Sequence, residues 1–147
     1  MNNIKQIVIE AITEAIAHEV KLVECAWGVS WNRRIGKWVF DDPHEKTSCA
    51  LGTVLLKYQP DQEGNLHTDE HVAAAKFFDV HEDYILGFVC GFDGVTGMKT
   101  EIGDSVMDWN QAHLGWADGM EVRNQFRDKI SNYEPDADSY CDDGCDE

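Results

Sequence analysis

The sequence predicts an all-α fold, a single compact bundle of about five helices that ends in a disordered acidic tail. Three observations predict it. Apolar residues recur at helical spacing over long stretches, and several of these stretches begin at a residue that suits a helix N-cap. The last fifteen residues hold seven acids and no base. We therefore expect a helical domain over residues 1–132 and a disordered acidic tail over residues 133–147.

The first predicted helix runs from Asn3 to about Trp27, and the rest of the chain is expected to pack around it. On a helical wheel its apolar arc spans roughly 220°, about twice the stripe of a helix that lies on a protein surface. A helix with so wide an apolar arc should be covered on two sides by other helices. Glu19 falls in the middle of this arc.

The last predicted helix covers about residues 105–130, and a basic residue interrupts its apolar stripe. Arg123 sits in the middle of its apolar stripe. Because an unpaired charge is costly to bury, we expect Glu19 and Arg123 to form a buried pair across a helix interface.

Three helices are expected between these two. The first spans Asp42 to about Tyr58, with Asp42 as its N-cap and no charge from Cys49 to Leu56. The second and third cover residues 69–78 and 82–92. Small residues four positions apart predict close helix packing; these are Gly87 with Gly91 and Gly115 with Gly119.

The charge of the chain points to its partners. Its 28 acidic and 12 basic side chains give a formal net charge of −16. Such a field repels nucleic acid and anionic membranes and attracts basic protein surfaces. The chain also lacks an apolar run of membrane-spanning length, so we expect a cytoplasmic protein, monomeric or homodimeric. It should not contact nucleic acid or a membrane directly.

Six residues are the candidate interaction residues. Tryptophans and bases alternate near residue 30, and a group of this kind can stack single-stranded nucleic acid. Three bases against a net charge of −16 make a protein contact the better interpretation. The other three candidates are acids at the two ends of the helix predicted at residues 82–92. The six residues are Trp31, Arg33, Arg34, Glu82, Asp83 and Asp93.

The sequence contains no motif for catalysis or for a cofactor, so we expect no enzyme activity. Five cysteines without a secretion signal do not support a disulfide framework, and the three outside the tail, Cys25, Cys49 and Cys90, are expected to be reduced core residues. No metal site is expected. The weak alternative is a partial set of ligands in the tail: Asp136, Asp138, Cys141 and Cys145.

These observations favour a small acidic regulator or inhibitor that docks on the basic surface of another protein. Its sharpest form is nucleic-acid mimicry, in which the acids occupy a surface that normally holds nucleic acid. The alternative is a helical protein that binds a small ligand or a metal. Its pocket would lie near Cys49, Cys90, His113 and Trp116.

Overall fold

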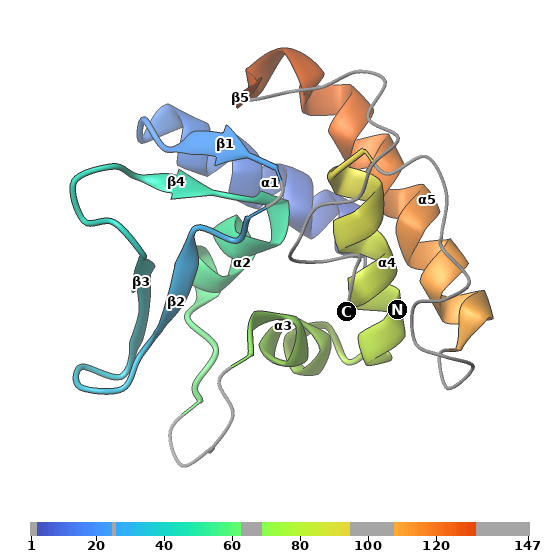
Figure 1. The fold of residues 1–147 in the computed structure, drawn as a ribbon, viewed down its shortest axis with the longest axis horizontal. Helices are drawn as coiled ribbons and strands as arrows, with labels where there is room; N and C mark the ends of the chain where they lie inside the picture. The colour runs from blue at the N-terminus through green and yellow to red at the C-terminus, as the bar shows by residue number, and fades with distance from the viewer. Residues whose placement is uncertain (1–2, 25, 63–68, 95–107, 132–147) are drawn as a thin grey trace.

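The computed structural model describes residues 3–24, 26–62, 69–94 and 108–131, and their fold is mixed α/β. The all-α prediction is therefore wrong. The described residues form five α-helices and five short strands, whose arrangement Figure 1 shows. In chain order the elements are α1 (Ile4–Ala17), β1 (Lys21–Val23), β2 (Val29–Asn32), β3 (Lys37–Phe40), β4 (Thr47–Ser48), α2 (Ala50–Tyr58), α3 (Glu70–Phe78), α4 (Glu82–Phe92), α5 (Trp109–Phe126), the 3-10 turn η2 (Arg127–Lys129) and β5 (Ile130–Ser131).

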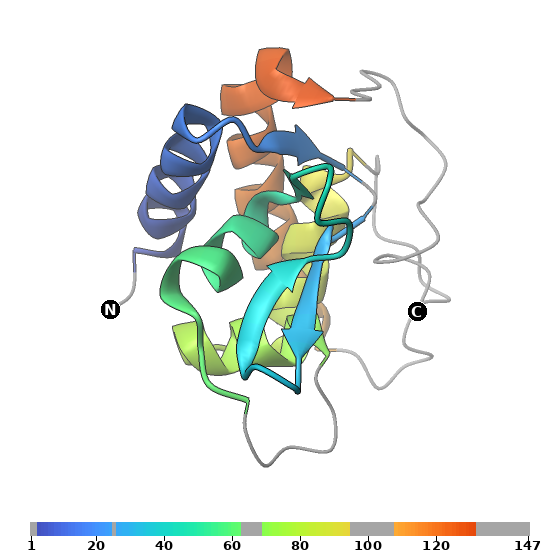
Figure 2. The same ribbon diagram turned by 90° about the vertical axis from the view of Figure 1, so that its left-hand side faces the viewer.

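The strands form two small sheets. One is parallel, in the order β4-β1-β5, and it places Leu22 of β1 between Ser48 and Ile130. The other is the antiparallel hairpin of β2 and β3, in which Trp31 lies opposite Trp38. The hairpin lies on the opposite side of the molecule from α5, as two perpendicular views show (Figures 1 and 2).

The predicted N-terminal helix is too long by ten residues. It ends at Ala17, because Glu19 adopts a left-handed conformation (φ 67°) and the Val20 amide closes the helix on the Ala15 carbonyl at 3.0 Å. The chain then forms β1, where burial of Leu22 between two parallel strands replaces the expected helical turns. The side chains of α1 that are fully buried are Val8, Ala11 and Ile12. Helix α1 is therefore a surface helix with one buried face.

The central element is α4 instead. Every residue from Gly87 to Phe92 is buried, and α4 lies alongside α5 in both views (Figures 1 and 2). The two helices are parallel, because Gly115 meets the Tyr84 carbonyl and Gly119, one turn further along, meets the Phe88 carbonyl. The close packing predicted from the glycine spacing is confirmed.

Helices α3 and α4 follow the predicted ranges closely, whereas the helix predicted from Asp42 begins only at Ala50. Asp42 caps a turn, accepting a hydrogen bond from the His44 amide at 2.9 Å. The N-cap of α2 is Cys49, whose Sγ accepts from the Gly52 amide at 3.3 Å. Over the described ranges, no helix is long and apolar enough to cross a membrane. The predicted acidic tail, residues 133–147, lies outside the described residues.

Candidate functional site

The candidate site is the β2–β3 hairpin, whose turn is held by its own side chains. The Asn32 Oδ1 accepts hydrogen bonds from the Arg34 amide (2.9 Å) and the Ile35 amide (3.4 Å), and the Asn32 carbonyl accepts from Gly36 (2.8 Å). Gly36 has a φ of 67°, which a residue with a side chain adopts only with strain. Asparagine at the start and glycine at the end therefore fix the turn and present Arg33, Arg34 and Ile35 to solvent.

The hairpin is tied to the body of the protein at Trp38. This side chain is 1% exposed, and its indole nitrogen donates to the Pro60 carbonyl at 2.8 Å. The Gln59 side chain then pairs with the backbone of Trp38: its Oε1 accepts from the Trp38 amide (2.7 Å), and its Nε2 donates to the Trp38 carbonyl (2.9 Å). The Trp31 ring packs edge-on against Trp38, with their centroids 5.5 Å apart. The hairpin is consequently a rigid projection.

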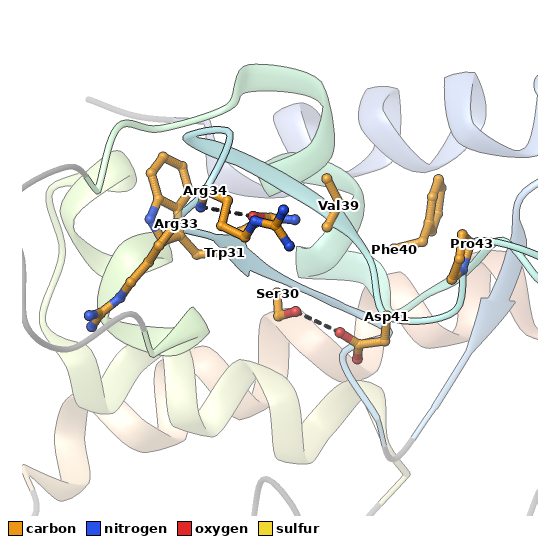
Figure 3. Close-up of a pocket in the computed structure, with 9 residues that line it drawn as sticks. Ser30, Trp31, Arg33, Arg34, Val39, Phe40, Asp41 and Pro43 are labelled. Carbon is orange, nitrogen blue, oxygen red and sulfur yellow. Dashed lines mark hydrogen bonds between the residues drawn. The ribbon is translucent and has the colours of Figure 1, made fainter.

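A hollow of about 780 Å³ lies along the hairpin (Figure 3). Arg33 and Arg34 line one end of it. At the other end the Ser30 hydroxyl donates to the Asp41 carboxylate at 2.7 Å, and Figure 3 shows Arg33 extending away from this pair. Trp31, Val39, Phe40 and Pro43 supply the apolar part of the lining. The hollow therefore combines the Arg34 cation, an apolar wall and a carboxylate that already accepts a hydrogen bond.

The hairpin is basic in an acidic chain. Residues 29–40 contain Arg33, Arg34 and Lys37 and no acid. The Arg34 and Lys37 side chains are exposed, and neither forms an ion pair with another described residue. By contrast, Lys5 and Lys57 are paired with Glu121 and Glu14. The geometry thus leaves cationic groups at the hairpin ready for an anionic ligand.

The predicted residues Trp31, Arg33 and Arg34 all line this hollow. The three predicted acids lie elsewhere, two in the first turn of α4 and the third directly after its end. Glu82 is exposed, with its carboxylate 3.9 Å from the His71 Nε2. The Asp83 carboxylate accepts from the Asp108 amide at 2.7 Å, so it holds the chain at the start of α5. Asp93 is only 3% exposed, and its prediction as an interaction residue is wrong because it is part of the protein interior.

The predicted pair of Glu19 and Arg123 is also wrong, although Arg123 does have a buried carboxylate partner. Glu19 is exposed, in the turn that ends α1. The Arg123 Nη1 donates instead to Glu24, which follows β1, and to the Phe92 carbonyl at 2.8 Å. Both members of the pair are buried, at 2% for Arg123 and 7% for Glu24. The pair joins β1, α4 and α5, which is the role expected for Glu19.

The four residues named for the alternative pocket lie in different surroundings, and the alternative stays a prediction. Cys49 is the buried cap of α2, and burial raises the pKa of its thiol to about 12. Cys90 is disulfide-bonded, so the prediction that it is a reduced core cysteine is wrong. His113 is exposed, with its ring centroid 6.0 Å from that of Trp109. None of these residues, nor Trp116, lines the hairpin hollow.

The metal prediction is not addressed by the described residues. They contain no group of three or more histidine, cysteine, aspartate or glutamate side chains placed to hold a metal ion. The weak alternative set of Asp136, Asp138, Cys141 and Cys145 lies outside the described residues.

Sequence reasoning missed two residues that shape the hairpin site: Asn32 and Gln59. Asparagine and glycine four positions apart, at Asn32 and Gly36, are a recognisable turn signal. Gln59 gave no such signal, because its role depends on a contact with Trp38 from a different element.

Comparison with protein-family models, curated proteins and solved structures finds no match to this chain. Its function has to be inferred from its own residues.

Proposed function

We propose that this chain is a small acidic protein that regulates or inhibits a protein partner by docking on a basic surface of that partner. The observation that carries the proposal is where the acids lie. The described residues include 18 acidic and 11 basic side chains, and of these acids only Glu24 and Asp93 are buried. The acidity therefore belongs to the surface of the folded body, where another protein meets it.

Charge of this kind acts mainly on association. A surface dominated by one sign of charge speeds encounter with an oppositely charged partner and disfavours other partners. A basic surface that normally holds nucleic acid is the most suitable partner, and nucleic-acid mimicry is the specific form of the proposal. It requires that nucleic acid and this chain compete for one surface.

Binding is a better proposal than catalysis for the groups the structure describes. A thiol acts as a nucleophile only as the thiolate, and the raised pKa of Cys49 keeps it protonated at physiological pH. The Cys90 sulfur already forms a disulfide bond and is not a free thiol.

A cytoplasmic location remains part of the proposal and has a direct test in Cys90. Disulfides are rare in the reducing cytosol. Because Cys90 is buried, free thiols must be alkylated in a denaturing lysis buffer; mass spectrometry would then find Cys90 alkylated in a cytoplasmic protein. Finding it protected would place the chain in an oxidising compartment.

The proposal is tested by a pull-down with the tagged full-length chain at about 50 mM and about 500 mM NaCl, because salt screens exposed charge. We expect a basic partner that is captured at low salt, lost at high salt and displaced by added duplex DNA or RNA. The variant carrying Glu10→Gln, Glu19→Gln and Asp128→Asn removes three exposed acids and should capture less partner. Lys76→Gln, which removes an exposed base, is the matched control and should capture at least as much as the unmodified chain. Capture that is insensitive to salt and to the three acids would refute docking by charge.

A further inference from the structure

We propose that the hairpin is a second binding site, of opposite charge to the rest of the surface. Its ligand is an acidic peptide segment of a partner protein, which adds as an extended strand along the outer edge of β2. This site goes beyond the proposed function, because it recognises acids and not bases.

The register of the hairpin determines which edge is available. Trp38 directs its amide and carbonyl away from β2, toward the Gln59 side chain. Residues directly opposite each other in an antiparallel pair share this orientation, so Trp31 directs its own amide and carbonyl away from β3. The Gly28 carbonyl accepts from the Asp41 amide at 2.9 Å. These residues lie three positions from Trp31 and Trp38, an odd number, so a hydrogen-bonded pair there fits the same alternation.

The two edges of the hairpin are therefore unlike. Gln59 occupies the outer edge of β3, where its side-chain amide takes the place of a neighbouring peptide group. On the outer edge of β2, no described residue hydrogen-bonds to the Trp31 amide or carbonyl. A donor and an acceptor on one exposed strand form the template for an added strand.

The charges of the hairpin favour an acidic strand. Arg34 lines the hollow and Lys37 stands opposite Asn32 in the hairpin register. Both side chains are exposed and without an ion-pair partner among the described residues. Carboxylates on an added strand would pair with these groups, while the apolar wall formed by Trp31, Val39 and Phe40 accepts an aliphatic or aromatic side chain between them.

A peptide fits this site better than single-stranded nucleic acid does. Strand addition uses the amide and carbonyl of Trp31 together, and a sugar–phosphate backbone cannot reproduce that alternation of donors and acceptors. Stacking requires a free aromatic face, but Trp31 is half-buried and packed against Trp38.

The test measures fluorescence anisotropy of a labelled octapeptide in which four glutamates alternate with four valines, titrated with the full-length chain. We expect saturable binding. The double variant Arg34→Gln with Lys37→Gln should weaken it about tenfold, since it removes two exposed ion pairs. Lys76→Gln removes the same kind of charge from α3 and should leave the affinity unchanged. All three substitutions are at exposed positions, and unchanged thermal unfolding will show that the variants are folded.

Two further probes separate strand addition from simple charge attraction. Peptides of the same sequence with methyl groups on alternate amide nitrogens keep every carboxylate, but the peptide methylated on the paired amides cannot donate to the Trp31 carbonyl. One of the two methylation patterns should therefore bind at least about tenfold more weakly than the parent peptide. An oligothymidine strand should not displace the peptide.

Four results would each overturn the proposal. These are no binding of the parent peptide, equal affinity for the double variant, equal affinity for both methylated peptides, and displacement by oligothymidine. The last result would assign the hairpin to nucleic acid. None of them bears on the pull-down of a basic partner, so this inference and the proposed function fail separately.

Discussion

Replacing Gly115 by alanine is expected to destabilise the protein strongly, because α5 approaches α4 there backbone to backbone. A methyl group on Gly115 would overlap the Tyr84 carbonyl oxygen, and it would lie 2.8 Å from the carbonyl carbon of Tyr84 and 2.9 Å from the Phe88 nitrogen. Ordinary contacts of such an atom begin at 3.4 Å. All three neighbours are backbone atoms of α4, so relief requires the helices to move apart.

The net cost follows from two opposing terms. Overpacking of this kind costs about 3 kcal/mol or more when the neighbour is rigid, while alanine stabilises the interior of a helix by about 1 kcal/mol relative to glycine. We expect the free energy of unfolding to fall by about 2–3 kcal/mol, and Tm by about 5–10 °C for a chain of this length. Gly119→Ala, one turn along the same interface, should have a similar effect. The two costs should not add, because the first separation of the helices also relieves the second overlap.

Urea unfolding followed by circular dichroism measures this effect. The matched control is Asn124→Ala, at an exposed position of the same helix, which should leave stability unchanged or raise it by about 0.5 kcal/mol through helix propensity. A Gly115→Ala protein as stable as this control would show that α4 and α5 are not in close backbone contact.

Three other predictions concern buried ionisable groups. Glu24→Ala leaves the Arg123 guanidinium buried without the Glu24 carboxylate and should lower the free energy of unfolding by about 3–5 kcal/mol. Glu19→Ala, at an exposed position, should change it by less than about 0.5 kcal/mol. Equal effects of the two substitutions would contradict the pairing of Glu24 with Arg123. Burial raises the pKa of the Tyr84 hydroxyl, so its contribution to stability is complete below about pH 10, the ordinary tyrosine pKa, and is lost as the pH rises further. An ultraviolet titration in which Tyr84 ionises together with the exposed Tyr58 would refute this. Burial likewise raises the pKa of the Cys49 thiol to about 12, so iodoacetamide at about pH 8.5 should alkylate Cys49 in urea and not in the native protein, as measured by peptide mass spectrometry.

The sequence predicted those elements whose stability is mainly local. Helices α3 and α4 have acidic residues at or near their starts, and the short turn between them contains Asp79 in a left-handed conformation. The glycine spacing also predicted the close packing, since four residues return to the same face of a helix. Both signals lie within a few positions of the structure they determine.

The sequence did not predict the elements whose stability depends on contacts between residues far apart in the chain. Strands β1, β4 and β5 are two or three residues long, too short for apolar alternation to distinguish them from a helix. They form because Leu22 packs between Ser48 and Ile130, which only the folded chain brings together. Extending the helix through this region placed Glu19 on its apolar face and Glu24 on its polar face. In the structure Glu19 is exposed and Glu24 is buried.

The candidate site was predicted in part for the same reason. Composition alone singles out Trp31, Arg33 and Arg34, because bases interleaved with aromatics are unusual in so acidic a chain. The available edge of β2 could not be predicted, since it depends on the hairpin register and on Gln59 closing the other edge.

The separation of charge within the molecule makes the two binding modes respond differently to salt. The hairpin lies on the opposite side of the molecule from α5 (Figure 1), and at physiological ionic strength charges are screened beyond about 8 Å. An acidic peptide at the hairpin then interacts mainly with Arg34 and Lys37, whereas at low salt it also meets the repulsion of the whole acidic body. Its affinity should therefore pass through a maximum as salt rises, while the affinity of a basic partner for the acidic body should fall throughout. Parallel salt titrations of the two ligands measure this difference, and a steady fall for both would show that the repulsion of the acidic body does not reach a peptide at the hairpin even at low salt.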